Sequence, residues 1–176
     1  MNIWHDINPK RISEDKFVAY IEIQSGCKNK YELDKETGLL RLDRILYTAT
    51  HYPANYGFIP RTYGDDNDPL DVLVVASEPI IPMTLVDCRP IGVIKMNDQG
   101  SNDEKIIAVC LSDPFYSNVK SIFDLPSHIL DEFKHFFEVY KTLENKITTV
   151  TEVDDVDEAK NIIRNCMNSY VEKFCK

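Results

Sequence analysis

The hydrophobic pattern of the sequence changes once along the chain, near Ser127. Before this point, short segments rich in Val, Ile, Leu and Tyr alternate with clusters of Gly, Pro, Asn and Asp, a pattern typical of β-strands joined by turns. We expect strands over residues 17–23, 31–34, 39–46, 71–76, 88–96 and 105–111. After Ser127, apolar residues recur every three or four positions, which indicates amphipathic helices.

Two helices are expected in this second part. The first follows Pro126, with Ser127 as its N-cap, and carries an apolar stripe that reaches Leu143. The second spans about residues 156–174, with a stripe that ends at Val171. Many short strands followed by two amphipathic helices predict an α+β, mainly β fold, in which a closed or nearly closed β-barrel has helices packed on its outside.

Length and charge limit the classes of function. The 176 residues suit one compact domain, so we expect residues 1–176 to form a single domain. The net charge of −9 repels phosphate backbones and anionic lipids, and we expect neither a nucleic-acid nor a membrane partner. A small anionic substrate stays compatible with this charge if metal ions or a local cluster of Lys and Arg reverse its sign at the site.

The cysteines and the apolar runs point to a cytoplasmic protein. Five cysteines are scattered along the chain without a C-x-x-C pair, which indicates reduced thiols rather than a disulfide framework or a zinc site. The first ten residues lack the apolar core of a signal peptide. The longest apolar run, residues 72–76, is too short to cross a bilayer.

The most acidic segment, residues 65–71, leads directly into an apolar strand. Its four carboxylates repel one another unless solvent or cations intervene. The segment is either a solvated turn or a site for a hard cation such as Mg²⁺ or Ca²⁺. An EF-hand is excluded, because the glycine that it requires is replaced by Leu70 or Asp71. Asp98 and Asp103, at the ends of two further strands, fit an ordinary polar hairpin when taken alone, but they could join this segment at a barrel mouth and hold two or more Mg²⁺ ions.

Several charged and aromatic residues are candidates for the site. Glu22 and Arg44 fall in phase with apolar residues of their strands, where an isolated charge is costly unless it meets an ion. For the others, the residues alone favour an ordinary structural role, as solvent-facing pairs or packed aromatics; they are Lys30, Glu32, Tyr52, Tyr56, Tyr140 and Lys141. The sequence contains no Walker A, G-x-G-x-x-G or G-x-S-x-G motif.

Taken together, these motifs resemble the soluble family I inorganic pyrophosphatases over residues 17–144. The most specific match is Asp66-Asn67-Asp68-Pro69-Leu70-Asp71, which has the family's D-x-D-P-x-D spacing before an apolar strand. The other matching segments follow in the family's order, at residues 21–23, 30–32, 43–44, 52–57, 95–98, 103–105 and 140–141.

The resemblance implies a role for each matching residue. Asp66, Asp71 and Asp103 would ligate the most tightly held Mg²⁺, with Asp71 bridging to a second ion. Asp98, Glu22 and Glu32 would hold further Mg²⁺ ions, directly or through water. Asp68 would be the general base for the attacking water. The residues expected to hold phosphate oxygens are Lys30, Arg44, Tyr56, Lys105, Tyr140 and Lys141, with Tyr52 in a secondary role.

The resemblance also implies the activity, the fold and the assembly. The chain would be a Mg²⁺-dependent hydrolase that converts pyrophosphate to two phosphates, with several Mg²⁺ ions in each active site. Its barrel would be five-stranded and OB-like with flanking helices, and its compact length is similar to the prokaryotic form, a homohexamer of two trimers. Two other classes stay open on the residues alone: an OB-like module that binds single-stranded nucleic acid, and a structural Ca²⁺-binding protein.

Overall fold

The computed structural model describes residues 1–176 and contains a closed barrel of five strands. The barrel strands are β1 (Phe17–Ile23), β4 (Asn55–Ile59), β5 (Leu70–Val75), β6 (Leu85–Asp98) and β7 (Ser101–Cys110). They are hydrogen-bonded in the order β1-β4-β5-β7-β6, and an additional pairing of β1 with β6 closes the ring. The expected five-stranded, mainly β fold is therefore confirmed.

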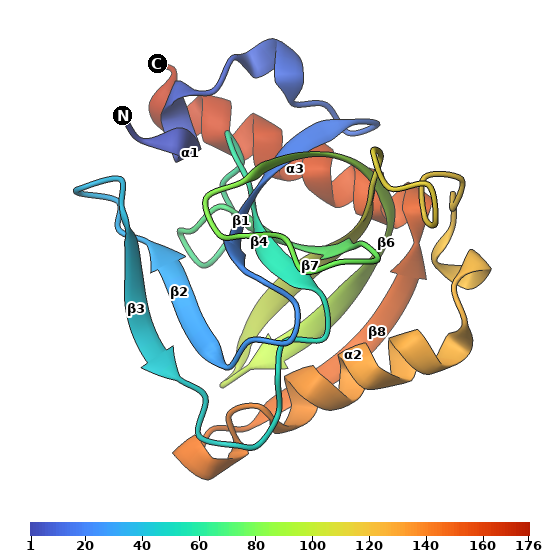
Figure 1. Cartoon of the computed structure of the whole chain (residues 1–176). Helices are drawn as coiled ribbons and strands as arrows, with labels where there is room; N and C mark the ends of the chain where they lie inside the picture. The colour runs from blue at the N-terminus through green and yellow to red at the C-terminus, as the bar shows by residue number, and fades with distance from the viewer.

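Three further strands lie outside this ring. β8 (Thr148–Asp155) pairs with β6 and extends the sheet beyond the barrel. β2 (Asn29–Leu33) and β3 (Leu40–Ile45) form a separate hairpin that stands beside the barrel (Figure 1). All pairings are antiparallel except β5 with β7, which run parallel with Asp71 opposite Lys105.

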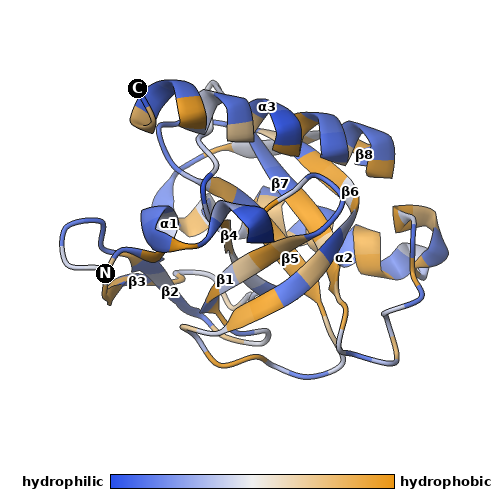
Figure 2. Cartoon of the chain, turned by 90° about the horizontal axis from the view of Figure 1, so that it is seen from above, coloured by the Kyte–Doolittle hydropathy of each residue, from blue (hydrophilic) through white to orange (hydrophobic).

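The helices lie against the outside of the strands (Figure 1). They are α1 (Ile3–Asp6), α2 (Ser127–Val139) and α3 (Val156–Phe174), and short 3-10 turns occupy Pro9–Arg11, Ile122–Asp124 and Thr142–Glu144. Strands of the barrel are largely hydrophobic, whereas α3 alternates polar and apolar residues (Figure 2). No helix combines the length and apolar composition needed to cross a membrane.

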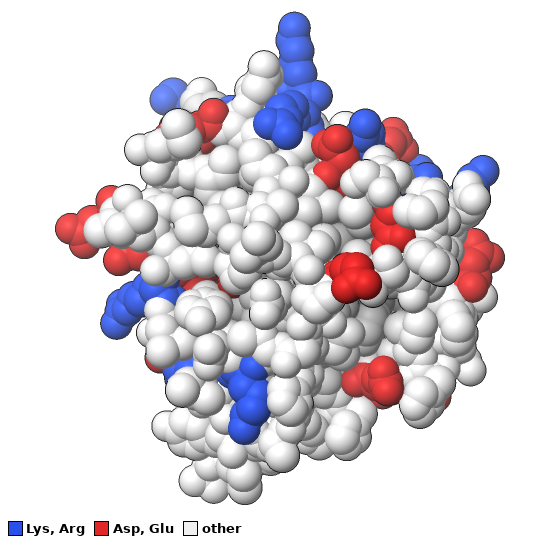
Figure 3. All heavy atoms as spheres, viewed as in Figure 1, with Lys and Arg blue, Asp and Glu red and all other residues white.

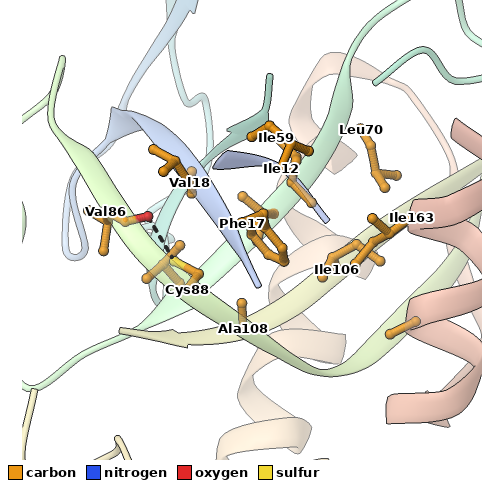
Figure 4. Packing of buried hydrophobic residues seen from close by; sticks show 14 of the residues in the cluster. Ile12, Phe17, Val18, Ile59, Leu70, Val86, Cys88, Ile106, Ala108 and Ile163 are labelled. Atoms are coloured by element: carbon orange, nitrogen blue, oxygen red, sulfur yellow. Dashed lines mark hydrogen bonds between the residues drawn. The ribbon is translucent and has the colours of Figure 1, made fainter. Parts of the chain in front are cut away.

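Two large hydrophobic clusters hold these layers together. Val72 and Val74 of β5 belong to a cluster of 20 buried residues that includes Ile162 and Ile163 of α3. The intervening Leu73 and Val75 belong to a cluster of 18 residues that includes the aromatic face of α2. The close-up in Figure 4 shows the first cluster. Because successive strand residues point to opposite faces, both faces of β5 are buried and the strand reads as a continuous apolar run.

Several boundaries differ from those expected. Strands β4 and β8 were not predicted, because β4 carries Asn55 and Gly57 and β8 is mostly polar and partly exposed. β6 and β7 are longer than expected because they continue as a hairpin past the barrel, through a two-residue turn in which Gln99 and Gly100 have φ of 53° and 89°.

The helix predictions also need correction. Ser127 is the first helical residue rather than the N-cap; Pro126 occupies that position without a side-chain hydrogen bond. α2 stops at Val139, so Leu143 lies in a 3-10 turn and is 64% exposed. Val171, expected on the buried stripe of α3, is 54% exposed, because it is the adjacent Tyr170, 3% exposed, that faces the cluster with Trp4 and Phe58.

Gly57 allows β1 and β4 to approach each other closely. A Cβ atom at Gly57 would lie 1.8 Å from the carbonyl oxygen of Tyr20, in the backbone of the neighbouring strand. No side-chain rotation can relieve an overlap with backbone, so the barrel needs glycine at this position.

We predict that Gly57→Ala lowers the free energy of unfolding by about 3 kcal/mol or more, because the two strands must separate. The matched control is Gly26→Ala, where no atom lies within 4 Å of the added Cβ and only the φ of 81° opposes the substitution. Gly26→Ala should lower the free energy of unfolding by about 1 kcal/mol. Urea denaturation measures both values, and equal losses would contradict the proposed strand contact.

Candidate active site

The largest group of chemically active side chains lines a cavity of about 530 Å³ between the β2–β3 hairpin and the barrel. All of the site residues predicted from the sequence, with one exception, lie in its wall: Glu22, Lys30, Glu32, Tyr52, Tyr56, Asp66, Asp68, Asp71, Asp98, Asp103, Lys105, Tyr140 and Lys141. These residues come from β1, β2, β4, β5, β6, β7, the loops before β4 and β5, and the residues just after α2. The fold therefore gathers segments that are far apart in the sequence.

Lys105 lies at the centre of this cavity and is 3% exposed. Its Nζ donates hydrogen bonds to Oδ2 of Asp71 at 2.8 Å, Oδ2 of Asp103 at 3.1 Å and Oη of Tyr56 at 2.9 Å. Tyr56 in turn donates to Oδ2 of Asp71 at 2.7 Å. The parallel register of β5 and β7 places Asp71 opposite Lys105, so strand pairing creates this network directly.

The network keeps Lys105 charged despite its burial. Burial alone would lower the pKa of Lys105, but the carboxylates of Asp103 and Asp71 raise it well above its usual value. The pKa of Asp103 is also raised, because burial and the neighbouring Asp71 outweigh the attraction of Lys105. The positive charge of Lys105 therefore only partly offsets the negative charges of Asp71 and Asp103.

The pKa values of two further carboxylates, Glu22 and Asp66, are also raised. Burial, followed by the charge of Asp71, raises the pKa of Glu22 to about 8, although its Oε2 accepts a hydrogen bond from the backbone N–H of Leu33 at 2.6 Å. Partial burial raises the pKa of Asp66, at the cavity edge, to about 6. Burial is the largest cause of these shifts and neighbouring carboxylates add to it, and a bound cation would favour the charged form of each group.

The lysines nearer the solvent are paired with carboxylates. Nζ of Lys141 lies 2.5 Å from Oδ2 of Asp98, at the end of the β6–β7 hairpin. Nζ of Lys30 lies 3.4 Å from Glu32 and 3.4 Å from Asp43. These partly exposed amino groups can turn toward an anion in the cavity, since each holds its partner through a single flexible side chain.

The tyrosines form the apolar floor of the cavity. Tyr52 and Tyr140 are 2% and 5% exposed and pack with Phe136. Tyr52 also lies against Tyr56, with ring centroids 5.2 Å apart. Burial raises the pKa of all three tyrosines, so their hydroxyl groups stay protonated and can donate hydrogen bonds.

Arg44 is the predicted site residue that does not line the cavity. Its Nη1 donates to Oδ2 of Asp43 at 2.6 Å, and its Nε lies 2.9 Å from Oε1 of Glu144, which holds the side chain toward the end of α2. The Nε contact is close but poorly aligned, so Nε and Nη2 are buried without a hydrogen-bond partner. The hairpin that carries Arg44 is also not a core element, since Leu42 and Ile45 are about half exposed.

Other residues of the cavity wall were not identified from the sequence. They include Trp4, Asp34, Lys35, Glu36 and Arg41, which come from α1, the β2–β3 turn and β3. Lys35 forms an ion pair with Asp68. A lysine in a polar turn gives no periodic signal, so this contact could be found only from the structure.

The donors of the cavity suit a hard metal ion. The acidic wall offers carboxylate oxygens without histidine or cysteine, which favours Mg²⁺ over zinc. No three acidic, histidine or cysteine side chains already converge as a preformed metal cluster, because Asp71 and Asp103 both turn to Lys105. The raised pKa values of Glu22, Asp66 and Asp103 are what a cation in this cavity would relieve, so the residues fit the ion chemically.

Comparisons with known proteins settle the family. A family model described as inorganic pyrophosphatase matches residues 19–171. The chain belongs to this family. It is 47% identical over 171 residues to soluble inorganic pyrophosphatase 2 of Chlamydomonas reinhardtii, an alignment that covers 97% of this chain and 89% of the algal protein.

Solved structures agree with this assignment. The inorganic pyrophosphatase of Thermus thermophilus superimposes with a TM-score of 0.92 at 35% identity, covering 97% of this chain and 99% of the other. The enzyme of Helicobacter pylori gives 0.87 at 43% identity, with 90% and 95% covered. Membership of a hydrolase family also removes the support for a nucleic-acid-binding module or a purely structural Ca²⁺ protein. On the face seen in Figure 3, Lys and Arg side chains form small separate groups rather than an extended basic surface.

We predict that Lys105→Met lowers the free energy of unfolding in EDTA by about 3 kcal/mol, because it leaves buried carboxylates without their cation. Urea denaturation gives the measurement. The control is Lys146→Met, at an exposed lysine without an ion pair, which should change stability by less than about 0.5 kcal/mol. A Lys105→Met protein as stable as the control would show that the central network does not support the fold.

Proposed function

We propose that this cavity hydrolyses inorganic pyrophosphate to two phosphates in a reaction that requires Mg²⁺. The family match and the collection of carboxylates, lysines and tyrosines in one cavity support this activity. The observation that carries the Mg²⁺ requirement is the excess of carboxylates around Lys105, the one fully buried cation. Pyrophosphate is itself a polyanion and would be repelled by such a site unless further cations are present.

The residues that would hold Mg²⁺ are the acidic groups of the cavity wall. Asp66, Asp71 and Asp103 come from the loop before β5, from β5 and from β7, and we assign them the most tightly held ion. Asp98, Glu22 and Glu32 surround them and would hold further ions, directly or through water. When bound, Mg²⁺ would neutralise charge on the substrate oxygens and lower the pKa of the attacking water.

Basic and phenolic groups would orient the substrate. Lys30, Lys105 and Lys141 all lie in the cavity wall, so three ammonium groups are available to contact phosphate oxygens. Tyr56 and Tyr140 can each donate a hydrogen bond, whereas Tyr52 supports Tyr56 by packing. Arg44 would have to leave Glu144 to reach a phosphate, and its unpartnered Nη2 makes such a move less costly.

Asp68 is suited to accept the proton of the attacking water. Its side chain is 50% exposed, lies in the cavity wall and is not part of the Lys105 network. A carboxylate that is open to solvent can pass the proton on after each cycle. The reaction then needs no covalent intermediate, because water attacks the phosphorus and a phosphate leaves.

Assembly and location are parts of the same proposal. A homohexamer of two trimers would have a mass six times the 20.3 kDa of one chain, which sedimentation or light scattering can measure. A reducing, cytoplasmic location is supported by the five free cysteines.

We predict that the purified protein releases phosphate rapidly from pyrophosphate with Mg²⁺, releases none in EDTA, and acts poorly on ATP. The carboxylates repel either substrate without a cation, and the cavity groups are close enough to surround only a compact anion. A phosphate-release assay with the two substrates gives the result. Equal rates with and without EDTA would refute the Mg²⁺ requirement, and equal rates with ATP would refute the substrate preference.

We predict that Asp68→Asn lowers kcat by at least about 100-fold while the fold and Mg²⁺ binding persist, because an amide cannot accept the proton. The matched control is Asp65→Asn in the same loop, an exposed residue outside the cavity wall, which should keep kcat within about 2-fold of the wild type. Circular dichroism and calorimetric Mg²⁺ titration check the fold and the ion sites. Wild-type turnover by Asp68→Asn would exclude Asp68 as the base.

A further inference from the structure

The two loops that meet at the mouth of the cavity are joined by one ion pair. Lys35, at the tip of the β2–β3 hairpin, pairs through Nζ with Oδ1 of Asp68, in the loop before β5. No other side chain or backbone group bonds the Asp68 carboxylate. Because we assign proton transfer to Asp68, its contact with Lys35 can affect the reaction.

The backbone of the hairpin tip is held in a defined shape. Oδ1 of Asp34 accepts a hydrogen bond from the backbone N–H of Glu36 at 2.9 Å, and the N–H of Gly38 donates to the carbonyl of Asp34 at 2.8 Å. Gly38 has a φ of 75°, and a Cβ there would lie 2.3 Å from the carbonyl oxygen of Met1. The tip therefore packs closely on the N-terminal segment.

That N-terminal segment supports Lys35 directly. Nδ2 of Asn2 donates to the carbonyl of Lys35 at 3.0 Å, and the Lys35 Nζ lies 5.2 Å from the centre of the Trp4 ring. Trp4 is itself 4% exposed and donates through Nε1 to the carbonyl of Thr62 at 2.8 Å. The ammonium group of Lys35 thus rests on a buried aromatic ring that is bonded to the chain just before the acidic loop.

The backbone of the acidic loop is equally well defined. The N–H of Gly64 donates to the carbonyl of Asp68 at 2.8 Å, and the N–H of Asp68 donates to Oδ1 of Asp66 at 3.1 Å. Tyr63 donates to Oδ1 of Asn67 at 2.5 Å, which supports the left-handed φ of 66° at Asn67. Within this ordered loop, the Asp68 carboxylate has Lys35 as its one side-chain partner, so Lys35 is the group that can fix its orientation.

We propose that Lys35 is a positioning residue for the hydrolysis, which holds the Asp68 carboxylate in the orientation that accepts the proton of the attacking water. The inference rests on the proposed role of Asp68. Lys35 acts through Asp68, and the N-terminal segment acts through Lys35 by placing the hairpin tip over the cavity mouth. Small displacements of a reacting group reduce rates strongly, so loss of this contact lowers the rate of the chemical step rather than substrate binding.

The test is a kinetic comparison of Lys35→Met and Lys35→Arg with the full-length enzyme, Mg²⁺ and pyrophosphate. We expect Lys35→Met to lower kcat about 10-fold with KM within about 2-fold of the wild type. Lys35→Arg should restore kcat to within about 3-fold, because a guanidinium can also pair with a carboxylate. Lys160→Met is the matched control, since Lys160 also forms a partly exposed pair, with Asp15 at 2.7 Å, on α3.

A double-mutant cycle separates positioning from a structural role. If Lys35 acts through Asp68, Lys35→Met should have no further effect on kcat in an Asp68→Asn background. The melting temperature should stay within about 2 °C of the wild type, because the pair is half exposed.

Three outcomes would overturn the proposal. They are wild-type kcat in Lys35→Met, an equal loss of kcat in both backgrounds, and a raised KM with unchanged kcat, which would make Lys35 a substrate contact. If Asp68→Asn alone turns over at the wild-type rate, the proposed function of Asp68 fails first. A large loss in Asp68→Asn with no effect of Lys35→Met would reject only the inference about Lys35.

Discussion

The ion pairs of the buried Lys105 connect the fold to the chemistry of the cavity. Lys105 bonds Asp71 and Asp103 from neighbouring strand positions, and it can do so because β5 and β7 pair in parallel with Asp71 opposite Lys105. An ammonium group buried to this extent is stable only beside carboxylates. The same carboxylates outnumber the cations that the protein provides, which is the basis of our proposal that metal ions bind before an anionic substrate. Strand register and burial thus produce the carboxylate-rich cavity from which we infer the need for metal.

The sequence predicted the fold class and nearly all of the residues that line the cavity, but not the ion pairs of Lys105. Long apolar runs and the switch to a helical period located β1, β5, α2 and α3, and acidic residues next to apolar strands marked Asp71 and Asp103 as candidates. The family resemblance then assigned their roles. β4 was missed because Asn55 and Gly57 interrupt its apolar pattern, although Gly57 is what lets β1 approach.

Contacts between distant segments could not be read from the sequence. Closure of the barrel depends on the pairing of β1 with β6, which no local pattern encodes. The contacts of Lys35 also could not be predicted, because they form only where α1, the hairpin tip and the acidic loop meet in space. Arg44 shows the opposite case: its position in the sequence matches the family motif, yet its side chain turns to Asp43 and Glu144 and lies outside the cavity wall. Under our proposal for Lys35, the N-terminal segment takes part in positioning Asp68, although its sequence carries no motif.

We propose that the cavity accepts pyrophosphate only after cations have reversed its charge. Calorimetric binding of methylenediphosphonate, an analogue whose bridging carbon prevents hydrolysis, tests this proposal apart from catalysis. We expect no detectable binding in EDTA and clear binding once Mg²⁺ is added, with an affinity that rises as the Mg²⁺ concentration rises. Binding of equal strength in EDTA and in Mg²⁺ would refute the proposal, because the lysines alone would then suffice to hold the substrate.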